Sequence, residues 1–259
     1  MSERTSRQSR RRAVEQARKK EAQRKRRRRL AVWGGAAVVL AGLGAGLGFA
    51  LPGGSSASGS SATGSAHYAA LSTLGPLKAA PAAGAMGPEK VPIPATPTLA
   101  GPSASTSGQT IDGISCQTAE QTVFHIHTHL TIFVHGQQRQ VPAGIGIPHA
   151  VAQQTSAGPF VDSGSCFYWL HTHAADGIIH IESPEQRTFT LGDFFDEWNQ
   201  PLSAGQVGSA KGAVTVIVNG KVWMGSPRNV PLGSHENLQV EVGAPLVAPE
   251  TINWSITGL

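Results

Sequence analysis

The stretch from Phe124 to His135 alternates between two kinds of side chain. The odd positions include three histidines in succession, and the even positions carry Ile126, Thr128, Leu130, Ile132 and Val134. A period of two is typical of a β-strand, whose side chains point alternately to the two faces of a sheet. We therefore expect a strand with one face in a hydrophobic core and the other face presenting imidazoles.

The spacing of these histidines suits metal binding. Side chains two residues apart on a strand lie roughly 6.5 to 7 Å from each other, so a His-x-His pair can hold one ion with ring nitrogens about 2 Å from it. Three in a row span about 13 Å, which is too far for one ion. We expect His127 or His129 to be a ligand, and His125 to orient a ligand through a hydrogen bond or to act as an extra one.

A second segment, from 170 to 182, carries four more potential ligands: His171, His173, His180 and Glu182. The Asp-Gly dipeptide at 176–177 is a hairpin signal. A two-residue turn there would place His173 opposite His180, whereas a four-residue turn over 174–177 would place His171 opposite His180. In either register the three histidines are expected ligands on one face, with Glu182 as an orienting partner or extra ligand.

Imidazole ligands favour Cu(II) or Zn(II) as the bound ion, and copper binds more tightly wherever it is available. A methionine-rich Cu(I) site is disfavoured because residues 111–259 contain only Met224. We expect a role in metal acquisition, delivery or buffering. Two alternatives stay open: a hydrolase or lyase with three histidines and an open coordination position, and a scaffold whose histidine face binds a protein in a pH-dependent way.

Charge divides the chain into two unlike parts. Residues 1–30 hold 14 Lys and Arg against three Glu, a net charge of +11, and the rest of the chain has a net charge of −6. An acidic folded part would repel phosphate, so nucleic acid is excluded as its partner. The sequence indicates no particular protein partner.

Residues 30–51 form an uncharged segment of 22 residues directly after the basic run. As a helix this segment would be about 33 Å long, enough to cross a bilayer. Basic residues on one side predict a cytoplasmic tail over 1–29 and a cell-membrane protein with a single span and an extracytoplasmic C-terminal part. A cleaved signal peptide is the alternative, but the charged and apolar regions are both longer than such peptides have.

Residues 52–110 are mainly Gly, Ser, Ala, Thr and Pro, with Lys78, Glu89 and Lys90 as their charged residues. This composition predicts a disordered linker. Residues 111–259 are then the folded, extracytoplasmic, histidine-rich domain.

The fold class expected for this domain is mainly β, an antiparallel sandwich or partly closed barrel with one short helix. Hairpins are predicted at His135-Gly136 and Asn219-Gly220. A capping box from Thr190 to Asp193 opens the helix. Further strands are expected over 238–242 and 252–256.

The two cysteines, Cys116 and Cys166, both lie in the predicted outer domain. A disulfide between them suits an oxidising compartment. The alternative is that Cys166 is a thiolate metal ligand. In a regular strand, however, Cys166 falls on the opposite face from His171 and His173, which favours the disulfide.

Three motifs resemble those of a family of bacterial membrane-anchored proteins. They are His125-x-His-x-His-Leu-Thr-Ile, Cys166-Phe-Tyr-Trp-Leu-His-Thr-His followed by Gly177-Ile-Ile-His-Ile-Glu, and Phe189-Thr-Leu-Gly-Asp-Phe-Phe. The resemblance covers roughly residues 111 to 245. It implies an anchored protein and carries no particular activity.

Overall fold

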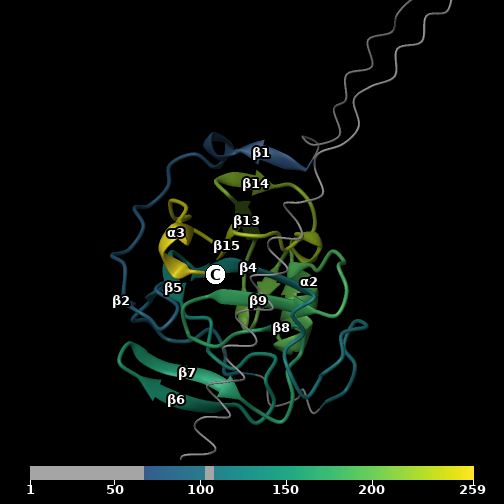
Figure 1. Ribbon diagram of the computed structural model, residues 1–259. Helices are drawn as coiled ribbons and strands as arrows, with labels where there is room; N and C mark the ends of the chain where they lie inside the picture. The colour runs from purple at the N-terminus through teal and green to yellow at the C-terminus, as the bar shows by residue number, and fades with distance from the viewer. Residues whose placement is uncertain (1–66, 103–107) are drawn as a thin grey trace, which may run out of the picture. The chain divides into compact units, whose positions relative to one another are not determined.

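The computed structural model describes residues 67–102 and 108–259 (Figure 1). The predicted basic tail, the membrane span at 30–51 and the first part of the linker lie outside these residues. Among the residues described, none of the helices combines the length and hydropathy needed to span a bilayer.

The principal element is a mixed eight-stranded sheet. In spatial order its strands are β1 (Tyr68–Ala70), β14 (Lys221–Trp223), β13 (Val214–Val218), β15 (Asn237–Val242), β4 (Phe124–Val134), β9 (Ile178–Ser183) and β8 (Leu170–His171), with β5 (Gln137–Arg139) also paired to β4. All pairs are antiparallel except β15 and β4, which are parallel. The mainly β prediction is confirmed, but the strand order has two ends, so the sheet is open and mixed instead of an antiparallel sandwich or barrel.

Smaller elements surround this sheet. The short ladders are β2 (Ala85–Met86) with β3 (Pro92–Ile93), β6 (Val151–Thr155) with β7 (Gly158–Ser163), and β10 (Leu202–Ser203), β11 (Gln206–Val207) and β12 (Ala210–Lys211). The helices are α2 (Leu191–Glu197) and the single turn α3 (Trp254–Thr257), with 3-10 turns η1 (Leu71–Leu74) and η2 (Pro227–Asn229). Figure 1 shows β6 and β7 beyond the β8 edge and β1 at the opposite edge.

Both predicted dipeptide hairpins are present. β4 pairs with β5 across His135 and Gly136, whose φ angles are 50° and 68°. β13 pairs with β14 across Asn219 and Gly220, whose φ angles are 48° and 76°. A tight hairpin turn needs positive φ at both central residues, which these residue types tolerate.

Helix α2 begins as predicted and covers one face of the sheet. The side chain of Thr190 accepts a hydrogen bond from the Asp193 amide, and the Asp193 carboxylate accepts one from the Thr190 amide. The helix lies against β8 and η2, and its apolar face shares one core with β4 and β9 that includes Leu130, Ile132, Ile179, Ile181, Phe194, Phe195 and Trp198. The even-numbered side of β4 is therefore the hydrophobic one, which leaves the histidines on the other face.

Two sequence predictions are wrong. Residues 67–102 do not form a disordered linker: β1 pairs with β14, the Lys78 amide donates to the Leu246 carbonyl at 2.8 Å, and Glu89 and Val91 are buried. This segment has too few apolar side chains to form a core of its own. Main-chain hydrogen bonds to the rest of the domain order it instead. The predicted strand at 252–256 is replaced by α3, because the Asn253 side chain caps a helical turn by accepting from the Ser255 amide.

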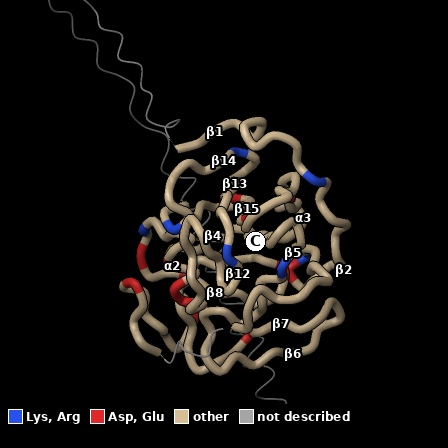
Figure 2. The backbone as a smooth tube through the Cα atoms, turned by 180° about the vertical axis from the view of Figure 1, so that it is seen from behind, with Lys and Arg blue, Asp and Glu red and all other residues tan. Residues whose placement is uncertain are grey.

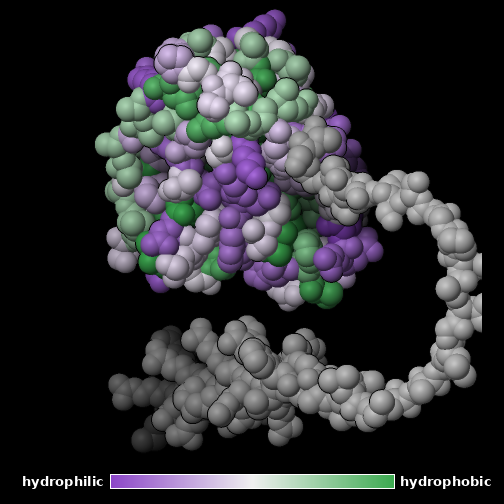
Figure 3. All heavy atoms as spheres, turned by 90° about the horizontal axis from the view of Figure 1, so that it is seen from above, coloured by the Kyte–Doolittle hydropathy of each residue, from purple (hydrophilic) through white to green (hydrophobic). Residues whose placement is uncertain are grey.

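The surface carries few charges and no broad apolar area in the views shown. Figure 2 shows Lys, Arg, Asp and Glu at scattered positions along the described chain. Figure 3 shows hydrophilic and hydrophobic residues interspersed over the face seen from above. The most exposed large hydrophobic residues, Val123 and Met224, are far apart in the sequence. The buried histidine face of the sheet is therefore the most distinctive chemical feature described.

Candidate metal centre

Three adjacent strands bring the predicted ligands together. In the β4–β9 ladder His127 lies opposite His180 and His125 opposite Glu182. In the β8–β9 ladder His171 lies opposite His180. This is the register predicted for a four-residue turn over 174–177, not the one for a two-residue turn. Because all these residues point to the same face, the imidazoles of β4, β8 and β9 meet over the middle strand.

The more enclosed of two potential ligand groups contains His171, His173, His180 and Glu182. One ligand atom from each lies within 4.8 Å of the others, and all four residues are buried, with exposed fractions of 5 % or less. Burial of so many imidazoles beside a carboxylate is costly unless they are paired or bind a cation. The group therefore has the composition and spacing of a metal site.

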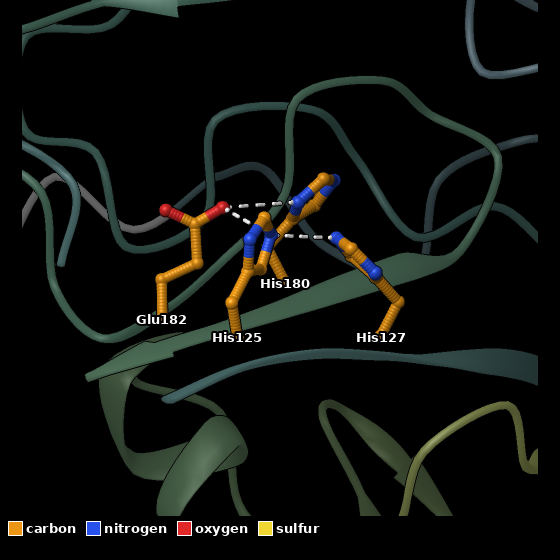
Figure 4. A group of neighbouring side chains, drawn as sticks. All are labelled: His125, His127, His180 and Glu182. Carbon is orange, nitrogen blue, oxygen red and sulfur yellow. Dashed lines mark hydrogen bonds and ion pairs between the residues drawn. The ribbon is translucent and has the colours of Figure 1, made fainter. Parts of the chain in front are cut away.

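The second group contains His125, His127, His180 and Glu182, again within 4.8 Å (Figure 4). His125 Nε2 lies 3.0 Å from Glu182 Oε1 and 3.0 Å from His127 Nε2. In Figure 4 the rings of His125 and His127 rise from the strand toward Glu182 and His180. His125 is exposed, so this side of the cluster faces the surface. The two groups share His180 and Glu182.

Main-chain carbonyls fix the ring orientation of two ligands. His171 Nδ1 donates to the Tyr168 carbonyl at 2.8 Å, and His173 Nδ1 donates to the Val161 carbonyl on β7. A carbonyl can only accept, so the proton of each neutral ring is on Nδ1 and the lone pair on Nε2. The two Nε2 atoms nevertheless lie 3.2 Å apart. Ligand atoms on a tetrahedral ion are separated by about 3.3 Å, so a shared cation would relieve this repulsion.

Glu89 completes the cluster and was missed by the sequence analysis. Its Oε1 lies 2.7 Å from His180 Nε2, and its exposed fraction is 6 %. It sits at the tip of the β2–β3 hairpin, which is closed by the Gly87 amide donating to the Val91 carbonyl at 2.8 Å. The available signal was its isolation, since Glu89 is the single acidic residue of 52–110. Glu120 also approaches, with Oε1 3.6 Å from His173 Nε2.

The protonation states follow from burial and contacts. Burial, with repulsion from neighbouring imidazoles, lowers the pKa of His127 to about 3 and lowers those of His171 and His173. Burial would also lower the pKa of His180, but the carboxylates of Glu182 and Glu89 outweigh it and raise this pKa to about 9. In the metal-free protein His180 is therefore the charged ring beside the neutral rings of His127, His171 and His173.

Glu182 is ionised at neutral and mildly acidic pH. Burial would raise its pKa, but contacts with His125 and His180 hold that pKa well below its usual range. Its Oε1 is 3.5 Å from His180 Nδ1, an ion-pair distance without hydrogen-bond geometry. A cation bound here would meet a full negative charge.

His129 is not brought into either ligand group. It lies opposite Ile178, at the end of the β4–β9 ladder. Its Nε2 donates to the Asp176 carbonyl at 3.0 Å, and burial lowers its pKa to about 4. The Cys116–Cys166 disulfide is present, so the thiolate-ligand alternative for Cys166 is wrong.

No protein-family model matches the chain, no curated protein matches it, and no solved structure matches it. The chemistry of the site is therefore the basis for a function.

Proposed function

We propose that this chain is a metal-binding protein that holds Cu(II) or Zn(II) in the cluster of His171, His173, His180 and Glu182. The observation that carries the proposal is the pair of buried Nε2 lone pairs, 3.2 Å apart, facing each other beside a carboxylate. Imidazole and carboxylate together suit both ions, and copper has the higher affinity by the usual order.

One ion per chain is the expected stoichiometry. The two ligand groups share His180 and Glu182, so filling one group uses ligands that the other needs. His127 and His125 then extend the site toward the surface, where an incoming ion would first meet them. Entry through an exposed histidine to a buried set suits acquisition, delivery or buffering of the ion.

We place the metal centre outside the cell, tethered to the membrane by residues 30–51. The disulfide supports this placement, because such bonds persist in oxidising compartments and are rare in the cytosol. The basic run followed by 22 uncharged residues supports the tether and its orientation. Protease digestion of intact cells, followed by detection of each end of the chain, tests it: the proposal requires cleavage of the C-terminal part only.

The position of the cavity described for this chain favours metal binding over catalysis. A hydrolase or lyase needs a substrate pocket over the ion and an open coordination position. The cavity next to the metal centre, at His129 and Thr131 of β4, is lined by none of the residues in the two ligand groups.

The test is metal loading of the full chain in detergent after treatment with a chelator. Elemental analysis after desalting is expected to give about one Cu(II) or Zn(II) per chain, and electron paramagnetic resonance of the copper form is expected to show nitrogen ligands. The His171→Ala, His173→Ala double variant should lose the ion. The matched control is His149→Ala, since His149 is exposed and bonded to Ser165. Metal content well below one per chain in the wild-type protein would reject the proposal.

A further inference from the structure

A cavity of about 320 Å³ lies beside the metal centre, further along the same face of β4. Its polar lining includes His129 and Thr131 of β4, Arg139 of β5, Asp176 of the β8–β9 turn and Glu250 of the C-terminal segment. Pockets that bind small molecules begin at about 300 Å³, so this space suits a small ligand.

Two buried acceptors at this cavity lack a hydrogen-bond partner within the described chain. His129 uses Nε2–H for the Asp176 carbonyl, so its Nδ1 carries a lone pair, and that atom is unpaired. Asp176 Oδ1 accepts from the Ile178 amide at 3.1 Å, but Oδ2 is unpaired. Both residues are at least nine-tenths buried. Unpaired buried acceptors are costly, and they match a ligand group with several donors.

The opposite charge is supplied by Arg139. Its Nη1 donates to the Gln138 carbonyl at 3.1 Å, and within the residues described it forms no ion pair with a carboxylate. Glu250, the other acid of the lining, is bound by Gln138 Nε2 at 2.9 Å. A guanidinium without a carboxylate partner can bind a ligand carboxylate through two parallel hydrogen bonds.

Prolines form much of the remaining wall, at positions 81, 92, 94 and 249. Proline has a fixed φ and no amide donor, so these walls are rigid and apolar. They give a ligand contact area without offering competing hydrogen bonds.

We propose that this cavity binds a small zwitterion of amino-acid or dipeptide size, with its ammonium group at Asp176 and His129 and its carboxylate at Arg139. A purely apolar ligand would leave the buried acceptors unpaired. An anion alone would gain nothing at Asp176, because burial and the charge of Glu89 raise the pKa of its carboxyl group to about 8. A ligand ammonium beside Asp176 would favour the ionised carboxylate. The site is distinct from the metal centre, and the proposal does not depend on which ion that centre holds.

The test is isothermal titration calorimetry of the full chain in detergent with alanine and with alanyl-alanine. Binding of at least one of the two is expected. N-acetyl-alanyl-alanine, which lacks the ammonium group, and alanyl-alanine amide, which lacks the carboxylate, should each bind roughly 30-fold more weakly or worse. These capped ligands test the proposal on the wild-type protein, so no variant needs to fold for the result to count.

Two variants locate the ligand. Arg139→Gln should weaken binding of the zwitterion roughly 30-fold while leaving the affinity for the amide unchanged. Asp176→Asn should weaken binding of alanyl-alanine roughly 30-fold while leaving the affinity for N-acetyl-alanyl-alanine unchanged. Metal content should be unaffected by Arg139→Gln. The proposal is overturned if neither zwitterion binds, if the capped ligands bind as well as the parent, or if Arg139→Gln binds alanyl-alanine like the wild-type protein.

Discussion

Glu89 and His180 form a buried ion pair, with 2.7 Å between Oε1 and Nε2, although 91 residues separate them in the sequence. His180 lies at the centre of the cluster, because both ligand groups include it. The pair means that the N-terminal segment supplies a carboxylate to the site that the histidine strands build. It also means that an ion that binds Nε2 of His180 must replace the proton that this nitrogen donates to Glu89.

The first prediction concerns this pair. Glu89→Gln should lower the pKa of His180 from about 9, because one of the two carboxylates that favour the charged ring is lost. Nuclear magnetic resonance titration of labelled histidine in the chelator-treated full chain measures this pKa.

The same pair has a consequence for stability, whose sign follows from the raised pKa. The folded value of about 9 exceeds the ordinary 6.5, so the pair's contribution is fully present below pH 6.5 and is lost as pH rises through about 9. Glu89→Gln should flatten this alkaline loss. An unchanged pKa of His180 in the variant would show that Glu89 does not set it.

The second prediction separates two glutamates on either side of Ser183. Glu182→Gln should lower metal affinity roughly 10-fold to 100-fold, as changes at or next to metal ligands do. Glu185→Gln should leave it unchanged, because Glu185 is exposed and in neither ligand group. Competition with a chromophoric chelator gives both affinities. Equal losses in the two variants would point to a general effect of negative charge instead of a ligand role.

The third prediction concerns acid stability in the metal-free state. Burial lowers the pKa of His127 to about 3. Between pH 6.5 and 3 the unfolded chain binds a proton at this histidine and the folded chain does not, so the wild-type protein loses stability as pH falls through this range. His127→Gln removes this loss. The free energy of unfolding of the variant relative to the wild-type protein should therefore rise over this range.

Urea denaturation of both proteins at a series of pH values, with chelator present, measures that difference. Other titrating groups are common to the two proteins and cancel in the comparison. A difference that stays constant with pH would mean that His127 is not buried as a neutral ring.

The fourth prediction concerns the disulfide. Cys116 and Cys166 close a loop with a sequence separation of 50, and the chain-entropy estimate for such a loop is about 4 kcal/mol. The Cys116→Ala, Cys166→Ala double variant should lose stability of this order. Urea unfolding compared with the wild-type protein tests it, and a loss near zero would show that the loop is already restricted in the unfolded chain.

Much of the histidine face could be predicted because its signals are local. The alternation at 124–134 fixed which residues share a face, and positive φ at Asn219-Gly220 and His135-Gly136 follows from residue type. The turn before Ile178 was harder, since two lengths of turn keep the same residues on the same face. The observed register, with His171 opposite His180, depends on the pairing of β9 with β4, which no local signal reveals.

The features that were missed depend on contacts distant in sequence. Glu89 lies in a segment whose composition is that of a linker, and only the docking of β2 and β3 against the histidine face buries it. The parallel pairing of β15 with β4 joins strands more than one hundred residues apart. His129 continues the His-x-His pattern, yet its ring bonds to the Asp176 carbonyl because the β8–β9 turn lies there.

Strand β4 is hydrogen-bonded on both sides, to β15 and β9, so its backbone is in the interior of the sheet. Its amide hydrogens are expected to be among the slowest in the domain to exchange with deuterated solvent, because exposing them requires breaking ladders on two sides. The imidazoles of His125 and His127 therefore lie on a strand held from both sides, whereas Glu89 lies between β2 and β3, a two-stranded ladder separate from the main sheet. If the β2–β3 ladder moved alone, Glu89 would leave His180 while the histidines of β4 kept their positions. An ion could then be exchanged while the domain stays folded.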